Sequence, residues 1–310
     1  METNGRADRR GHRRAHRQGR RRGASPRAVA GAVLGAAVLA LGGGIGAPAA
    51  EAGTAGTAGT TAGDGPAGGP VPVVAAAAPA PAAVPVGPRE LFVGDWETGD
   101  FSQWETCQAK NLNGRCRNIG AGNEQMRIVE GAEARQGRYA ARFNIRPGDV
   151  PPFGGSERSE VQSNADGAVV REGDERWYQW SMKFPTDFQN PTGVWFIVLQ
   201  WHSAKGSPPL AINVDRRGQI VIGGDGLIDE PRRTIGTVRR GEWVDYVLHV
   251  KFSRDSDTGF VEGWENGRQT VPRYHRASMV DGSNYLKQGV YRDRGPATWV
   301  MQDGLRVTAP

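Results

Sequence analysis

The stretch W243-V-D-Y-V-L-H-V-K-F252 alternates large apolar residues with mostly polar ones. Side chains of a β-strand point alternately to its two faces. One face is therefore predicted to enter a core, and it carries Val244, Tyr246, Leu248, Val250 and Phe252. The other face is predicted to meet solvent, which gives His249 the ordinary role of a surface residue between Asp245 and Lys251. The stretch predicts an antiparallel strand with one buried face.

Similar short runs recur through the C-terminal two thirds of the chain, separated by Gly, Asp, Asn and Pro. Residues 265–268, Glu-Asn-Gly-Arg, are typical of a hairpin with a type I′ turn. No stretch shows a convincing helical stripe of apolar residues. About a dozen strands predict an all-β fold, a concanavalin-like β-sandwich jelly roll of two antiparallel sheets. The predicted strands begin at residues 126, 139, 156, 177, 194, 210, 219, 243, 259, 285, 298 and 305.

The residues before this domain are predicted to be an export signal and a linker. Residues 1–52 run from an arginine-rich start through an apolar segment to small residues, the pattern of a signal peptide. A retained membrane anchor is the alternative, but the apolar segment is rich in glycine, and a span needs about 20 strongly apolar residues. Residues 53–88 are almost all Ala, Gly, Pro, Thr and Val, which predicts a disordered linker. One domain, 89–310, remains.

The positive charge of the chain belongs to the predicted signal peptide. Residues 1–52 hold ten arginines against Glu2, Asp8 and Glu51, a net charge of +7, whereas the whole chain carries +6. The difference leaves about −1 for the rest, so the basic composition gives no reason to expect nucleic acid as a partner. We expect a secreted protein, a monomer with no stable membrane span after processing.

Two cysteines, Cys107 and Cys116, lie close together near the start of the domain. In an exported protein this spacing favours a disulfide that closes a short loop. A metal pair is the alternative, but it would need more Cys or His nearby.

Three predicted strands carry polar residues at positions that share one face. The strand S156–Q162 places Arg158, Glu160 and Gln162 on one face. The apolar strand V194–H202 ends in Gln200 and His202, again two positions apart. Polar groups at the end of such an apolar strand are expected to line a cleft or to be satisfied internally.

The third strand, Y285-L-K-Q-G-V-Y-R292, places Lys287, Gly289 and Tyr291 on one face. The glycine is expected to let a sugar ring approach the backbone. Arg, Gln, His, Lys and Tyr together suit β-elimination at a 4-linked uronic acid. That reaction needs donors that neutralise the C6 carboxylate, a base for the C5 proton and an acid for the departing oxygen.

These strands resemble known enzymes. R158-S-E-V161, Q200-W-H202 and Y285-L-K-Q-G-V-Y291 look like the three active-site motifs of jelly-roll alginate lyases. The wider pattern over residues 89–310 resembles the heparin-lyase-I-like and glucuronan-lyase families. Val161 replaces the usual Leu of alginate lyases, and Arg-Asp follows Tyr291 instead of Asn-Gln. These departures favour the glucuronan and heparin side.

The resemblance implies a role for each matching residue. Arg158 and Gln200 would hold the uronate carboxylate, and His202 would be the base or would help to neutralise the carboxylate. Tyr291 would be the acid and, for some substrates, also the base. Lys287 would bind substrate, and Glu160 and Arg292 are further substrate-binding candidates. The implied partner is an acidic polysaccharide, and the chemistry itself would need no cofactor.

The resemblance also suggests a structural Ca²⁺ that joins the two ends of the domain. The candidate ligands are the carboxylates of Glu97, Asp100 and Asp303, because calcium prefers oxygen donors. Ordinary turn residues are the alternative, since Asp-Gly and Gly-Asp are common in turns.

Ordinary structural roles remain open for the candidate residues. Arg158 and Glu160 could form a cross-strand ion pair, Tyr291 could be a half-buried core aromatic, and His202 could be satisfied at a strand end. A non-catalytic glycan-binding module would use aromatic platforms, for which the candidates are Trp195, Trp201 and Trp264. A glycoside hydrolase would need two carboxylates across a cleft, and no such pair is evident.

Overall fold

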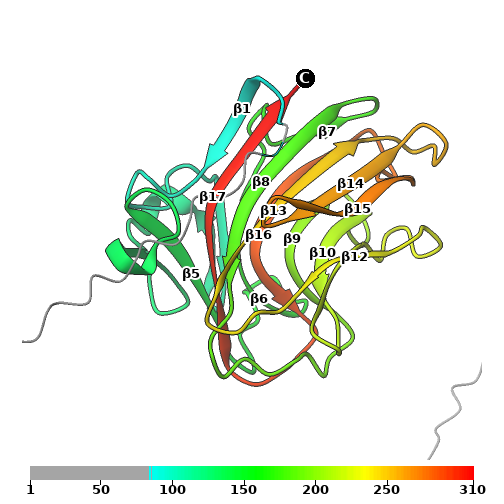
Figure 1. The fold of residues 1–310 in the computed structure, drawn as a ribbon. Coiled ribbons are helices and arrows are strands. Elements are labelled where there is room, and N and C mark those ends of the chain that lie inside the picture. The colour runs from blue at the N-terminus through cyan, green and yellow to red at the C-terminus, as the bar shows by residue number, and fades with distance from the viewer. Residues whose placement is uncertain (1–83, 85) are drawn as a thin grey trace, which may run out of the picture. The chain divides into compact units, whose positions relative to one another are not determined.

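The computed structural model describes residue 84 and residues 86–310, so the predicted signal peptide and most of the predicted linker lie outside the described residues. The described part contains seventeen β-strands and two short 3₁₀ helices, Cys116–Asn118 and Gly131–Glu133. The strands form two antiparallel sheets, stacked as layers in Figure 1. The all-β sandwich is therefore confirmed. Within the described residues, no helix is long and apolar enough to cross a membrane.

The first sheet has eight strands in the order β15-β14-β13-β8-β17-β5-β4, with β1 also paired to β17. Its strands are β1 (Arg89–Gly94), β4 (Met126–Glu130), β5 (Tyr139–Ile145), β8 (Glu175–Lys183), β13 (Trp243–Lys251), β14 (Phe260–Glu265), β15 (Arg268–His275) and β17 (Thr298–Ala309).

The second sheet has nine strands in the order β12-β11-β10-β9-β16-β6-β2-β3, with β7 also paired to β16. Its strands are β2 (Thr106–Ala109), β3 (Leu112–Arg115), β6 (Glu157–Ser163), β7 (Val170–Arg171), β9 (Phe196–His202), β10 (Leu210–Val214), β11 (Gln219–Gly223), β12 (Arg233–Thr237) and β16 (Ser283–Arg292).

The apolar faces of the two sheets form one core. All five residues predicted to face inward, from Val244 to Phe252, are buried; four belong to β13 and Phe252 follows it. The outward face differs from the prediction, because Asp245 and His249 are only 8% and 5% exposed. Asp245 is covered by Arg135, whose Nε and Nη2 donate to its two oxygens at 3.0 and 2.7 Å. A charged residue on the outer face is thus buried because a neighbouring loop supplies its partner.

The predicted hairpin at residues 265–268 is confirmed between β14 and β15. Asn266 and Gly267 have φ angles of 48° and 80°, as a type I′ turn requires. The two strands predicted at 298–303 and 305–309 are instead one strand, β17. Gly304, at φ 61°, absorbs a register shift against β8 there, so the chain bends without leaving the sheet.

The disulfide between Cys107 and Cys116 is formed, with the Cα atoms 4.9 Å apart. It joins β2 to the residue that follows β3, and both cysteines are fully buried. A cross-link over so short a loop stabilises the protein by about 2–3 kcal/mol in the chain-entropy description. It also fixes the β2–β3 hairpin at the edge of the nine-stranded sheet.

Candidate active site

The three strands with the candidate residues are neighbours in the nine-stranded sheet, in the order β9-β16-β6. Their register sets Lys287 directly opposite both Gln200 and Gln162, and sets Tyr291 opposite Arg158. Residues opposite each other on adjacent strands carry their side chains on the same face. Because Leu286 faces the core, this face is the outer one. The fold thus brings the three predicted motifs together.

Glu160 lies at the centre of the cluster and is only 2% exposed. Its Oε1 accepts from Nη1 of Arg158 at 3.0 Å and from Nζ of Lys287, and its Oε2 accepts from Nε2 of Gln200 at 2.8 Å. Nζ of Lys287 also donates to Oε1 of Gln108 at 2.8 Å. Glu160 and Lys287 are therefore engaged with the protein, whereas the sequence predicts that they contact substrate. Their observed contacts instead fix the positions of Arg158 and Gln200.

The buried charges of this cluster are unequal, with two cations, Arg158 and Lys287, around the single carboxylate of Glu160. Burial lowers the pKa of the Lys287 ammonium, and Glu160 acts in the opposite direction. The excess of positive charge suits an anionic ligand. Two polar atoms remain buried without a hydrogen-bond partner, Nε of Arg158 and Oε1 of Gln200. They can pair with a ligand that enters the site.

His202 stands at the edge of this cluster and is half-buried. Its Nδ1 lies 2.5 Å from the carbonyl oxygen of Ser203, which can only accept a hydrogen bond. Nδ1 therefore carries a proton, and in the neutral ring the lone pair is on Nε2. Burial lowers the pKa of His202, and the charges of Lys287 and Arg158 lower it further, against the Ser203 carbonyl and Glu160. The ring is thus held in the neutral form that can accept a proton.

Two tyrosines of β16 face the same region. Tyr291 is half-buried, and the guanidinium of Arg158 lies 4.2 Å from the centre of its ring. The Tyr285 hydroxyl lies 3.2 Å from Nδ1 of His202, and the two rings stack with centroids 5.4 Å apart. Burial raises the pKa of Tyr285. The sequence prediction gave Tyr285 no role, although its position two residues before Lys287 placed it on the same face.

Arg292 does not lie on the face of the sheet that carries Lys287 and Tyr291. It is 1% exposed, and its guanidinium donates to Glu157 at 2.8 Å and to the carbonyl oxygens of Gly295 and Pro296. Strand alternation explains the difference, since Arg292 follows Tyr291 directly and so points to the opposite face. The prediction that Arg292 binds substrate is therefore wrong.

The structure explains why position 289 is a glycine. Its φ is 133°, and a Cβ there would lie 2.6 Å from Cα of Glu160 and would clash with the carbonyl oxygen of Ser159. Glycine is thus required by the close approach of β16 to β6. Space for a sugar ring, the expected reason for Gly289, is not needed to explain the glycine.

Two of the three predicted aromatic platforms are buried, Trp201 in the core and Trp264 on the outer face of the other sheet. Trp201 and Trp264 are 0% and 9% exposed, so neither can present a ring face to a sugar. Trp195 is half-buried and its ring centre lies 6.0 Å from that of Tyr291. An extended aromatic platform made of these three residues is absent.

The three residues predicted to bind calcium are not grouped into a metal site. Among the described residues, no three His, Cys, Asp or Glu side chains are grouped so that they could hold a metal ion. Glu97 and Asp303 each accept two backbone N–H groups of the segment 135–139, and Asp100 accepts from the backbone of Ser102. Only Oδ1 of Asp303 is buried without a partner. The observed roles are therefore those of turn and loop anchors.

The comparisons with known proteins give the family and the fold of the chain. The profile of the family described as "Polysaccharide lyase" matches residues 96–307. No curated protein sequence matches the chain.

One solved structure with a TM-score above 0.5 shares the fold at low sequence identity, and two others have scores just below that value. The endo-β-1,4-glucuronan lyase of the fungus Trichoderma reesei matches with a TM-score of 0.51 at 18% identity, over 71% of this chain and 96% of that one. A glycoside hydrolase family 131 domain from Coprinopsis cinerea has a TM-score of 0.49 at 14% identity, over 72% and 95%. An alginate lyase from Corynebacterium sp. has 0.48 at 14%, over 67% and 97%. The family match spans most of the domain, and the chain belongs to the polysaccharide lyase family.

Proposed function

We propose that this polysaccharide lyase cleaves a uronic-acid-containing polysaccharide by β-elimination, with a glucuronan-like polymer as the first candidate. The observation that carries the proposal is the cluster of Arg158, Gln200, His202 and Tyr291 on three adjacent strands. The cluster has an excess of positive charge and holds one histidine in its neutral form. Both properties suit proton removal from a sugar that carries a carboxylate.

The first requirement is to neutralise the C6 carboxylate of the substrate, which makes the C5 proton more acidic. Nε of Arg158, buried and without a partner, can donate to that carboxylate. Oε1 of Gln200 can accept a hydrogen bond from the same group when it holds a proton. A fixed donor such as the Arg158 guanidinium, in a site shielded from water, stabilises developing negative charge strongly.

The second requirement is a pair of groups that move protons. Nε2 of His202 takes the C5 proton, because Nδ1 is fixed by the Ser203 carbonyl. The electron pair of the C5–H bond forms the C4–C5 double bond, and the C4–O4 bond breaks. The Tyr291 hydroxyl gives its proton to the departing O4, which leaves an unsaturated uronate and a new chain end.

A panel of polymers tests this function directly. The domain is incubated with glucuronan, alginate, heparin, hyaluronan and pectate, and the ultraviolet absorbance of the unsaturated product is followed. Tyr291→Phe is expected to lose about 10²–10⁴-fold in turnover, whereas Tyr274→Phe, a half-buried tyrosine of the other sheet, is the matched control. Full activity of folded Tyr291→Phe would remove Tyr291 from the mechanism, and no product from any polymer would contradict the substrate class.

We also propose that the enzyme is exported. The composition of residues 1–52 and the buried disulfide of the domain support this. Expression of the full chain in a host that secretes proteins should release the domain into the medium without residues 1–52. Mass spectrometry of the released protein measures where the chain now begins, and an uncleaved chain in the cell would contradict export.

A further inference from the structure

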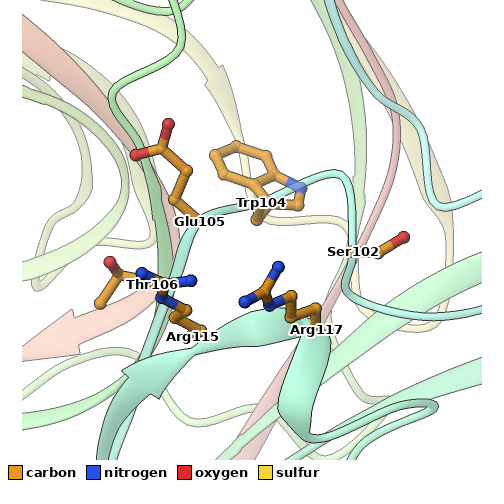
Figure 2. A pocket seen from close by; sticks show the side chains of 6 residues that line it. All are labelled: Ser102, Trp104, Glu105, Thr106, Arg115 and Arg117. Carbon is orange, nitrogen blue, oxygen red and sulfur yellow. The ribbon is translucent and has the colours of Figure 1, made fainter.

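A surface pocket of about 400 Å³ lies beside the β2–β3 hairpin, away from the residues proposed to react. It is lined by Ser102, Trp104, Glu105, Thr106, Arg115 and Arg117. In Figure 2 the guanidinium of Arg117 points toward the space beneath Trp104, and that of Arg115 lies beside Thr106. The Glu105 carboxylate points away from both. The proposed mechanism uses none of these residues.

The pocket lies on the same face of the sheet as the candidate active site. Arg115 is opposite Thr106, Thr106 is opposite Gln162, and Gln162 is opposite Lys287. Side chains in such a row share one face. Two strand spacings of about 4.8 Å each separate Lys287 from Thr106, so the pocket begins roughly 10 Å from Lys287. Arg115 lies one spacing further, roughly 14 Å away. A polysaccharide chain that crosses the strands would reach it within a few sugar residues.

The charge of the pocket is available to a ligand. Arg115 and Arg117 are both exposed, and neither has an ion-pair or side-chain hydrogen-bond partner among the residues that the structure describes. The carboxylate of Glu105 instead accepts from the backbone N–H of Asn164 at 3.0 Å. Guanidinium groups bind carboxylates with two parallel hydrogen bonds, which makes arginine well suited to a uronate.

The backbone that carries these arginines is fixed before a ligand binds. Arg115 and Arg117 flank Cys116, whose disulfide to Cys107 closes the hairpin. Both cysteines are fully buried, so the cross-link also anchors the hairpin to the core. Holding binding groups in place beforehand reduces the entropy lost on association.

We propose that this pocket is a distal subsite that binds the carboxylate of a second uronate residue in the same polymer chain. The inference rests on the proposed function, because it takes the substrate to be a polyuronate. Arg115 and Arg117 form the carboxylate contacts, and the hydroxyls of Ser102 and Thr106 are available to sugar hydroxyls. The subsite favours long chains over short ones, since only a long chain reaches both places.

The test compares chain lengths in the Arg115→Gln/Arg117→Gln double variant. The measured quantity is kcat/KM on the polymer divided by kcat/KM on the shortest oligosaccharide that the wild-type enzyme cleaves. We expect this ratio to fall about tenfold, and the fall to shrink as ionic strength rises. Arg89→Gln/Arg268→Gln is the matched control, because it removes two exposed arginines from the other sheet and should keep the wild-type ratio.

Several outcomes would overturn the subsite. An unchanged ratio in a folded double variant, or an equal loss on polymer and short oligosaccharide, would each contradict it. A wild-type enzyme with no elimination activity would instead contradict the proposed function, so the two failures are distinguishable. Calorimetric titration of a uronate oligosaccharide into Tyr291→Phe gives a readout without turnover. There the two added Arg→Gln changes should weaken binding of long chains about tenfold, and unaltered affinity would also overturn the subsite.

Discussion

His202 and His249 both lie on outer faces of strands, one in each sheet, but their surroundings differ in one decisive way. Both ring nitrogens of His249 face carboxylates, with Nδ1 2.7 Å from Glu262 and Nε2 2.7 Å from Glu175. The ring also stacks on Trp177 with centroids 3.8 Å apart. His202 has only Nδ1 fixed, by the Ser203 carbonyl, and its Nε2 makes no hydrogen bond to another described residue.

The difference separates a structural histidine from one that can move protons. His249 has no ring nitrogen free to take a proton from another molecule, and it is only 5% exposed. His202 is half-buried, and its free nitrogen belongs to a ring whose pKa is lowered by burial. A fixed tautomer with one open nitrogen is what general base catalysis needs. Two histidines with similar positions in the strand pattern thus differ through their partners.

Replacement of each histidine by glutamine should show the difference between them most clearly. His202→Gln is expected to lower kcat by about 10²–10⁴-fold, because the proposed base is gone, with little change in stability. His249→Gln should keep its activity but lose about 1–3 kcal/mol of unfolding free energy, because two carboxylates lose a partner. Steady-state kinetics and urea unfolding of both variants measure the two effects. Equal activity losses in the two variants would contradict the distinction.

Loss of the carboxylate beside the candidate active site should cost more stability than loss of the carboxylate beside His249. Glu160 is 2% exposed and is bonded to two cations and an amide, so Glu160→Gln should cost about 3–5 kcal/mol of unfolding free energy. Glu262, whose side chain is 14% exposed, bonds His249 and the half-exposed Arg273. Glu262→Gln should therefore cost only about 1 kcal/mol.

Urea unfolding measures both carboxylate variants. Activity gives a second readout, because Glu160→Gln should also lower kcat through the displaced Arg158 and Gln200, whereas Glu262→Gln should not. A Glu160→Gln variant as stable and as active as the wild type would show that this carboxylate does not organise the site.

Strand periodicity predicted much of the fold, because alternation depends only on local sequence. It placed four residues of β13 and the following Phe252 in the core, and the hairpin turn at Asn266 and Gly267. It also placed Lys287 and Tyr291 on one face of β16. Alternation does not say what covers a face. Asp245 and His249 therefore point outward as predicted, but they are buried by partners from other strands and loops.

The remaining features depend on contacts between residues far apart in the sequence. Gln108 bonds Lys287 across 179 positions, and only the pairing of β2 with β6 brings it there. The β2 and β3 strands have four residues each, too short for a periodic signal. Register also decides that Tyr285 meets His202. Each of these contacts requires the sheet order, which the pattern of a single strand does not contain.

The pH dependence of activity should sharpen the role assigned to His202. His202 must be neutral to act as the base, and its pKa is lowered in the folded protein. The rise of kcat/KM with pH should therefore have its midpoint below 6.5, the usual histidine value. Lys287→Gln removes a charge that lowers this pKa, and the rise should move to higher pH. His249→Gln is the control and should leave the rise in place.

A pH–rate profile of kcat/KM measures this rise, and circular dichroism shows whether Lys287→Gln remains folded. If the rise of kcat/KM moved to another pH in His249→Gln, the assignment of this rise to His202 would be contradicted. The same holds if the rise did not move in a folded Lys287→Gln variant. The comparison is informative because both variants replace one nearly buried polar side chain by glutamine, but only Lys287 acts on the pKa of His202.

The smallest expected effect concerns Tyr285, which touches the histidine without replacing any of its functions. Its hydroxyl lies 3.2 Å from Nδ1 of His202, a nitrogen already fixed by the Ser203 carbonyl at 2.5 Å. Tyr285→Phe keeps the stacked ring and removes one weak polar contact, so kcat should fall only about 2- to 10-fold, as expected for one hydrogen bond of about 0.5–1.5 kcal/mol. Tyr285→Leu also removes the stacking and should lose more. If Tyr285→Phe were as inactive as His202→Gln, the hydroxyl itself would be the proton carrier and the histidine its support.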